Sequence, residues 1–218
     1  MRELTVDLFI SVDGFASGAK EAAFFGYFGE ELGSWVSDHL HQPQLLIMGR
    51  VTYEALAQFS ANGTDEVSVR KTEPPKIVFS STLKEPLGWK NTLLVKNSVG
   101  DELRALKQHP GDPLRSIGSI SLVNSLMQLG LVDRLRLIVF PVILGVVGRE
   151  WICAGYPRTA LELIDSKVLD SRLIVLEHRP VRPCGLRRQD QTGTLLPRPE
   201  SRLPHRRSLS SRRCSSPW

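Results

Sequence analysis

The sequence contains few cysteines and no long apolar run. Its three cysteines, Cys153, Cys184 and Cys214, have no metal-ligand spacing, and their odd number argues against a disulfide framework. The longest apolar stretch, residues 137–147, includes a proline and a glycine and is shorter than the roughly 18 residues that a membrane span needs. The N-terminus lacks the basic start and unbroken apolar core of a signal peptide. These absences favour a protein of the reducing cytoplasm, without a membrane segment.

Residues 1–181 contain no internal repeat and no low-complexity segment, and the composition then changes abruptly. The whole chain of 218 residues is 41% apolar and 23% charged, which is typical of a globular protein. Residues 182–218, however, contain nine arginines, one aspartate, one glutamate and no lysine, a local charge of +7. Subtracting this from the whole-chain charge of +5 leaves −2 for residues 1–181. The basic character of the chain therefore belongs to its C-terminal tail.

The tail has five prolines and six serines, and it shows no helical or strand period. Such a segment cannot bury enough apolar surface to offset its chain entropy, so we predict a disordered basic tail over residues 182–218. Arginine clusters also contact nucleic-acid phosphates. No aromatic residue is interleaved with them before Trp218, so a solvated extension is favoured over a nucleic-acid-binding arm.

The hydrophobic pattern of residues 1–181 predicts an α/β fold. Strand and helix alternate through the first two-thirds of this region, which implies a mostly parallel sheet flanked by helices. Strands then run together at the end, which implies an antiparallel hairpin on the same, mixed sheet. The expected strands are 4–10, 45–48, 76–81, 92–96, 114–119, 133–144, 160–170 and 172–178, and the expected helices are 32–40, 50–59, 99–108 and 121–129. We predict one domain over residues 1–181.

Three predicted strands end in residues suited to holding a phosphate. Gly49–Thr52 follows the second strand, Ser80–Thr82 the third, and Gly118–Ser121 the fifth. Ligands of open α/β sheets bind beyond the carboxyl ends of the strands, where helix N-termini attract anions. Glycine lets backbone approach a ligand, hydroxyls donate to phosphate oxygens, and arginine grips them through two N–H groups.

Each of these signals is weak when taken alone. Gly49 can be only a tight turn, Thr52 only a helix cap, and Ser80 and Ser81 only a polar loop. Their recurrence at three strand ends favours a large phosphate-bearing cofactor. No metal site is expected, because His39 and His41 lie two apart on a predicted helix and point in different directions.

Five short motifs resemble a known family. In order along the chain they are SVDGF, MGRVTYE, KIVFSSTL, GSISLVNSLMQLGLVD and FPVILG. In order and spacing they are similar to the dihydrofolate-reductase-like superfamily, and most similar to the group related to the C-terminal reductase domain of bacterial riboflavin biosynthesis. The resemblance covers about residues 3–180. No zinc-deaminase motif accompanies it, so only the reductase half is expected.

The resemblance implies NADPH as the cofactor. It places Arg50 near the adenosine 2′-phosphate, with Gly49 and Thr52 near the diphosphate. The resemblance also implies that Ser80, Ser81 and Thr82 lie along the adenosine ribose, and that Gly118, Ser119 and Leu122 pack against the diphosphate. The substrate side is implied to be formed by a loop and a strand end, which contain Asp13, Gly14, Pro141, Leu144 and Gly145.

The implied chemistry is hydride transfer to a pyrimidine-nucleotide or pterin-like substrate, as in 5-amino-6-(5-phosphoribosylamino)uracil reductase. Alternatives are a dihydrofolate reductase proper and a catalytically inactive NADP-binding protein. Asp13 is the catalytic candidate that orients or supplies the proton, although Asp-Gly is also ordinary turn chemistry. The family's usual loop ending is replaced here by residues 150–152, which affects the substrate side more than the cofactor side. The resemblance further implies a homodimer.

Overall fold

The computed structural model describes residues 1–19, 23–60, 63–64 and 66–181. The chain divides into a compact unit, Met1–Cys184, and a second segment, Gly185–Trp218. The predicted disordered tail, residues 182–218, lies outside the described residues. The elements in chain order are β1 (Leu4–Ser11), β2 (Phe15–Gly18), η1 (Ala23–Gly26), α1 (Glu30–His41), β3 (Leu45–Gly49), α2 (Arg50–Ser60), α3 (Glu66–Thr72), β4 (Lys76–Phe79), β5 (Thr92–Val95), α4 (Val99–Gln108), β6 (Leu114–Ile117), α5 (Ile120–Gln128), β7 (Arg134–Phe140), η2 (Gly145–Val147), β8 (Gly148–Trp151), β9 (Ala160–Leu169) and β10 (Leu173–Val181).

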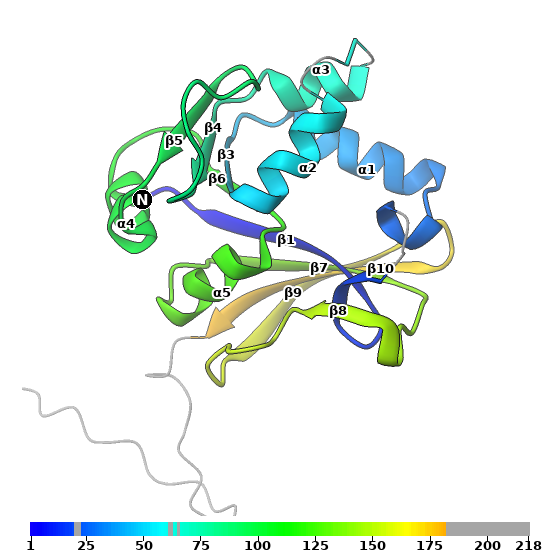
Figure 1. The fold of residues 1–218 in the computed structure, drawn as a ribbon. Helices are drawn as coiled ribbons and strands as arrows, with labels where there is room; N and C mark the ends of the chain where they lie inside the picture. Colours follow the sequence, from blue (N-terminus) through cyan, green and yellow to red (C-terminus); the bar gives the residue numbers. More distant parts are fainter. Residues whose placement is uncertain (20–22, 61–62, 65, 182–218) are drawn as a thin grey trace, which may run out of the picture. The chain divides into compact units, whose positions relative to one another are not determined.

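The central sheet has eight strands in the order β5-β4-β3-β6-β1-β7-β10-β9 (Figure 1). All pairs from β5 to β7 are parallel, whereas β10 is antiparallel to both β7 and β9. The predicted fold class is confirmed: the structure is α/β, with a mixed, mostly parallel central sheet flanked by helices and a C-terminal antiparallel hairpin. No helix in the described ranges is long and apolar enough to cross a membrane.

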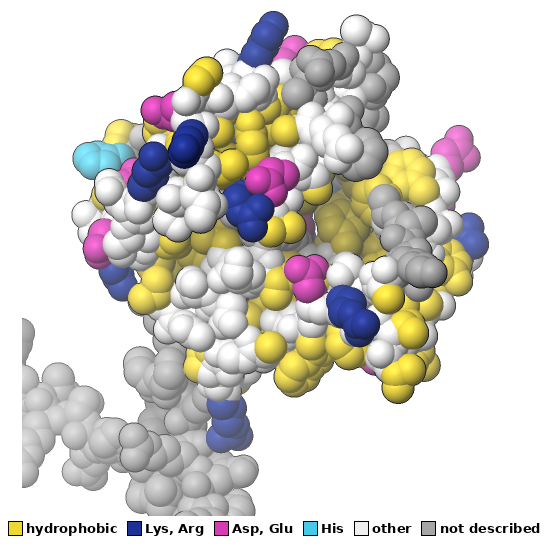
Figure 2. Space-filling view, in the orientation of Figure 1, with side chains coloured by type: hydrophobic (Ala, Val, Ile, Leu, Met, Phe, Trp, Pro, Cys, Tyr) yellow, Lys and Arg dark blue, Asp and Glu magenta, His cyan; other side chains and the backbone are white. Residues whose placement is uncertain are grey.

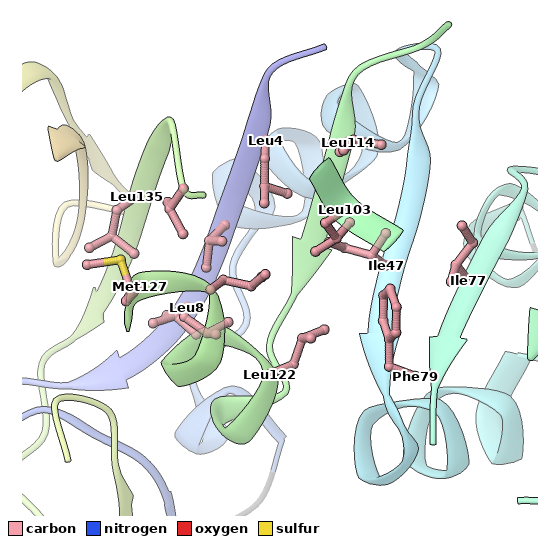
Figure 3. Close-up of a cluster of buried hydrophobic side chains, with 14 of the residues drawn as sticks. Leu4, Leu8, Ile47, Ile77, Phe79, Leu103, Leu114, Leu122, Met127 and Leu135 are labelled. Atoms are coloured by element: carbon pink, nitrogen blue, oxygen red, sulfur yellow. The ribbon is translucent and has the colours of Figure 1, made fainter. Parts of the chain in front are cut away.

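Helices cover the parallel part of the sheet on both faces. On β3, Leu46 and Met48 pack with Tyr53 of α2, whereas the intervening Ile47 belongs to the cluster of the opposite face. This alternation is the two-residue period of a strand buried on both sides. Figure 3 shows the opposite cluster, in which Leu122 of α5 packs with side chains of β1, β3 and β4. The core therefore forms two apolar layers, one on each side of the sheet.

One charged cluster lies within this core. Asp7 of β1 is fully buried and accepts hydrogen bonds at 2.6 Å from the Nε atoms of Arg115 on β6 and Arg136 on β7. Arg115 also donates to the carbonyl oxygen of His39 at 3.0 Å, and Arg136 lies 5.3 Å from the ring centre of Trp35. The single carboxylate thus neutralises the charge of only one of the two buried guanidinium groups. The His39 carbonyl oxygen of α1 accepts a hydrogen bond from one of the remaining guanidinium N–H groups.

The structure also differs from the sequence-based expectations. Between the first predicted strand and the first predicted helix, where no regular element was expected, the chain forms β2, which pairs with β8 across more than a hundred residues of chain. The short helix α3 was not predicted. The strand predicted over 133–144 already ends at Phe140, because Pro141 has no N–H to continue the ladder. These corrections concern short elements at the ends of the strands.

Candidate functional site

The carboxyl ends of β3 and β6 form a topological switch point. The two strands are parallel neighbours, but β3 continues into α2 on one face of the sheet and β6 into α5 on the other. Such a point opens a crevice in α/β sheets, and ligands bind there. A cavity of about 940 Å³ lies at this position. Figure 2 shows the surface hollowed between the part that holds α2 and the part that holds α5 and β8.

All nine residues predicted to bind a cofactor line this one cavity. They come from the ends of three strands and the first turns of two helices: Gly49, Arg50, Thr52, Ser80, Ser81, Thr82, Gly118, Ser119 and Leu122. The strand ends that were separate in sequence are therefore adjacent in space. Hydroxyl groups, glycine backbone and the N-termini of α2 and α5 thus surround the same cavity.

Ser119 connects the two sides of the switch point. Its hydroxyl oxygen accepts a hydrogen bond from the backbone N–H of Gly49 at 2.6 Å and donates one to the Thr52 hydroxyl at 2.6 Å. Ser119 and the preceding Gly118 both have positive φ, 64° and 76°. A Cβ atom at Gly49 would lie 3.2 Å from the Ser119 hydroxyl, so the close approach of the two turns favours glycine there.

The first turn of α5 is available to an anion. Ser119 occupies its N-cap position but makes no side-chain capping hydrogen bond, because its hydroxyl is directed to Gly49 and Thr52. The first N–H groups of α5, at the cavity wall, therefore have no capping partner from Ser119, and the positive end of the helix dipole favours negative charge there. A phosphate group is the kind of ligand that this arrangement suits.

Among the described residues, three charged side chains line the cavity: Arg50, Lys96 and Glu150. Arg50 donates to Glu54 at 2.7 Å, four residues later on α2, and both side chains are about half exposed. An exposed pair of this type is worth about 0.3–0.5 kcal/mol, so a phosphate can recruit Arg50 at little cost. Lys96, which follows β5, is exposed and forms no ion pair with the residues that the structure describes.

The five residues predicted for the substrate side gather in a second cluster beside the cavity. The Asp13 carboxylate accepts hydrogen bonds from the Ser11 hydroxyl at 2.7 Å and from the N–H groups of Leu144 at 3.2 Å and Gly145 at 2.7 Å. It thereby joins the turn after β1 to the turn after β7, where Pro141 also lies.

These contacts define the protonation of Asp13. The Ser11 hydroxyl contributes most to lowering the pKa of Asp13, the N–H groups of Gly145 and Leu144 lower it further, and partial desolvation opposes them. The group is therefore ionised at neutral pH. This geometry suits orientation of the loop, whereas donation of a proton needs the protonated form.

Gly14 contacts Trp151 and Ile152, which follow the turn after β7. Its φ is +83°, its carbonyl oxygen accepts a hydrogen bond from the Ile152 N–H at 3.0 Å, and a Cβ atom would approach the Trp151 indole nitrogen at 3.2 Å. The neighbouring Ala16 and Glu150 line the cavity. The five residues of the second cluster do not themselves line the cavity, and the chain connects them to it through Ala16 and Glu150.

Sequence reasoning missed several lining residues, among them Ala16, Lys96, Asn97 and Glu150. Lys96 is the last residue of the predicted strand 92–96 and Asn97 follows it, so the strand-end argument could have found them. Ala16 and Glu150 carried no such signal, because they reach the cavity only through the pairing of β2 with β8. Within the described ranges, His, Cys, Asp and Glu side chains form no group of three or more that could hold a metal ion.

Solved structures share this fold. A Shewanella sp. PV-4 protein named for riboflavin biosynthesis superposes with a TM-score of 0.64 at 18% identity, over 83% of this chain and 99% of that one. A pyrimidine reductase-like protein of Corynebacterium diphtheriae gives 0.60 at 14% identity, over 83% and 92%. A Thermotoga maritima diaminohydroxyphosphoribosylaminopyrimidine deaminase/5-amino-6-(5-phosphoribosylamino)uracil reductase gives 0.58 at 16%, over 83% and 57%.

Sequence comparison agrees with the structural likeness. The chain is 25% identical over 178 residues to YyaP, an uncharacterised Bacillus subtilis protein, covering 79% of this chain and 92% of that protein. The family model described as RibD C-terminal domain matches residues 2–175, which include the whole cavity and nearly the whole sheet. This chain therefore belongs to the RibD C-terminal domain family.

Proposed function

We propose that this protein is an NADPH-dependent reductase that delivers a hydride to a pyrimidine-nucleotide or pterin-like substrate, in the manner of 5-amino-6-(5-phosphoribosylamino)uracil reductase. The observation that carries the proposal is the convergence of the ends of β3, β4, β5 and β6 on one cavity at a switch point. Membership of the RibD C-terminal domain family supports a reductase-type activity. Bound NADPH would supply the hydride from its nicotinamide ring.

The centre of the cavity fits a diphosphate. The turns Gly49–Thr52 and Gly118–Leu122 meet there with two helix N-termini. Neither Gly49 nor Gly118 has a Cβ atom, so oxygen atoms can approach the backbone closely. The hydroxyls of Thr52 and Ser119 add donors, although their present hydrogen bond must then be shared or exchanged.

The outer end of the cavity fits the adenosine side of the cofactor. Ser80–Thr82 follows β4 and Lys96 follows the edge strand β5, whereas β1 lies on the other side of β6. Lys96 and Arg50 are the basic groups of the cavity, and a ribose 2′-phosphate needs such groups. This charge supports NADP in preference to NAD.

The inner end then holds the nicotinamide and the substrate. The Asp13 carboxylate accepts hydrogen bonds from the N–H groups of Leu144 and Gly145, and it thereby fixes the turn that leads through η2 into β8 and Glu150. Glu150 is the acidic side chain of the lining, and its carboxylate can accept N–H groups of a pyrimidine or hold a proton for transfer. The ionised Asp13 positions the loop in this proposal.

Cofactor choice is tested by titrating the full chain with NADPH and NADH while tryptophan fluorescence is followed. We expect NADPH to bind more tightly, and Lys96→Met to raise the Kd for NADPH about tenfold, because a charge-assisted phosphate contact contributes about 1.5–3 kcal/mol. The same substitution should leave NADH binding unchanged. The exposed Lys90, outside the cavity lining, gives the matched control Lys90→Met, with no effect on either cofactor.

Turnover is tested by absorbance loss at the reduced-nicotinamide band with ribosylaminopyrimidines and dihydropterins. Reduction of a ribosylaminopyrimidine supports the proposal, whereas reduction of dihydrofolate alone identifies a dihydrofolate reductase proper. Cofactor binding without turnover of either class identifies an inactive NADP-binding protein. Failure to bind either nicotinamide dinucleotide would refute the proposal altogether.

A further inference from the structure

The inner end of the cavity, next to β1, differs in chemistry from the outer end. It is lined by Phe9 of β1, Ala16 of β2 and Glu150 of β8. Neighbouring strands are about 4.8 Å apart, so the order β5-β4-β3-β6-β1 places about 19 Å between the ends of β5 and β1. A group bound beside Phe9 is therefore out of reach of Lys96, which follows β5. Arg50, which follows β3, also lies on the cofactor side of β6.

Aromatic rings continue from the inner end toward solvent. The Phe9 ring centre lies 5.3 Å from that of Phe24, in an edge-to-face arrangement at 73°, and Phe24 lies 5.3 Å from Phe28. Phe9 and Phe24 are only partly buried, and Phe28 is 61% exposed. In Figure 2, hydrophobic side chains line the hollow on its right-hand side, toward the segment before α1. Partly open aromatic rings of this kind bind flat heterocycles by stacking.

The aromatic segment has a strained backbone. Phe24 and Phe25 are consecutive residues with positive φ, 54° and 51°. Residues other than glycine rarely adopt this conformation, and it persists only where the surrounding structure enforces it, as at ligand sites. Glu150 shares the property, with a φ of +58° within β8. Strain therefore occurs on two sides of the inner end.

Glu150 gives the inner end a negative charge. The Ser17 hydroxyl donates to its Oε2 atom at 3.2 Å, and no residue in the described part of the chain donates to its Oε1 atom or forms an ion pair with it. Such an oxygen suits an N–H or cationic group of a ligand. The same carboxylate repels a phosphate.

The helix N-terminus beside the aromatic segment is closed to a phosphate as well. α1 begins directly after this segment, and its N–H groups at Glu31 and Leu32 already donate to the Asp170 carboxylate, at 3.0 and 3.2 Å. Glu30 adds a further acid to the first turn. The exposed Arg149 of β8 does not line the cavity. Among the lining residues that the structure describes, cations are thus confined to the cofactor side.

We propose that the substrate of this reductase carries no phosphate and is a flat, N–H-bearing heterocycle that stacks on Phe9 and donates to Glu150. A ribosylaminopyrimidine without its phosphate and a dihydropterin both have this chemistry. The inference rests on the proposed function and narrows its substrate class. The reduction adds a hydride from NADPH and a proton from solvent to one C=N bond of the substrate, and NADP is the other product.

The test uses two pairs of compounds whose members differ only in a phosphate. One pair is 5-amino-6-(5-phosphoribosylamino)uracil and the same compound freed of its phosphate, and the other is a dihydropterin with and without a phosphate on its side chain. In the pair that is reduced, we expect kcat/KM to be at least about tenfold higher for the member without phosphate, because like charges in a binding site repel. Calorimetric titration of the full chain in the presence of NADP should give the same order of affinity without turnover.

Three variants assign the preference to these residues. Glu150→Lys should reverse the preference within a pair, because a cation then faces the phosphate. Glu162→Lys makes the same change at an exposed position outside the lining and should leave the ratio unchanged. Phe9→Leu should raise KM for both members about tenfold, because stacking is lost, and should preserve their ratio. Circular dichroism verifies that each variant is folded.

The outcomes separate this inference from the proposed function. A wild-type preference for the phosphorylated member, or equal use of both members, would overturn the inference and leave the reductase activity in place. Tighter binding of the member without phosphate, with no oxidation of NADPH, would support the inference and overturn the proposed function. Binding of no member of either pair would overturn both.

Discussion

The Ser119 hydroxyl offers a sensitive test of how the candidate site is held together. Ser119 combines two properties: its hydroxyl bridges Gly49 and Thr52, and its backbone has a φ of +64°. The first property should stabilise the fold, whereas the second should cost free energy in any residue with a Cβ atom. Replacing Ser119 by alanine and by glycine separates the two.

The expected magnitudes follow from these contacts. Ser119→Ala removes two hydrogen bonds worth about 1 kcal/mol each and leaves the Gly49 N–H without its partner, so the free energy of unfolding should fall by roughly 2–4 kcal/mol. Ser119→Gly loses the same contacts but relieves about 1–2 kcal/mol of left-handed strain. The glycine variant should therefore be more stable than the alanine variant by about that amount.

The assay is equilibrium unfolding in urea, with the free energy obtained from the midpoint and slope. Ser125→Ala is the matched control, because the Ser125 hydroxyl only donates to the Ser121 carbonyl within α5 at 3.2 Å. It should change stability by less than about 0.5 kcal/mol. The reasoning fails if alanine is tolerated better than glycine at position 119, or if both variants unfold like the wild type.

Three further predictions concern buried or cavity-lining charges. Asp7→Asn leaves two buried guanidinium groups, those of Arg115 and Arg136, without a carboxylate and should cost about 3–5 kcal/mol in urea unfolding; a loss below 1 kcal/mol would contradict this. Burial lowers the pKa of Lys76 from 10.5 to about 8, so between these values the unfolded chain binds the extra proton and stability should rise with pH. Lys76→Met should flatten that rise in thermal unfolding measured from pH 8 to 10.5; an unchanged slope would argue against it. Glu150→Gln should lower kcat/KM for the reduced substrate while leaving the Kd for NADPH unchanged, and a parallel loss of cofactor binding would assign Glu150 to the cofactor instead.

Much of the fold could be predicted because its signals are local. The continuous apolar run at β3 and the alternation of apolar with other side chains in β1 reflect burial on the faces of the sheet. Because this pattern lies in consecutive residues, it can be recognised in the sequence. The elements that were missed lack such a signal. β2 has four residues, Phe15–Gly18, and its partner β8 lies far along the chain, so only the folded structure brings the two together.

The nine cavity-lining residues could be predicted to lie together because parallel strands bring their carboxyl ends to one edge of the sheet, whatever the conformation of the loops. Their hydrogen bonds could not be read from the sequence, since the contact of Ser119 with Gly49 depends on β6 lying beside β3. For Asp13, an acid in a turn could be predicted, whereas the three hydrogen-bond donors that lower its pKa are evident only from the structure.

Sequence patterns alone predict the fold class, the strand ends whose residues suit a phosphate and the position at which the composition changes. The tertiary structure decided which of these residues meet, that Lys96 and Glu150 join them, and that the Phe9 ring lies at the inner end of the cavity. The physical reason is that periodicity records whether a side chain is buried, whereas strand order and register determine which other side chains it contacts.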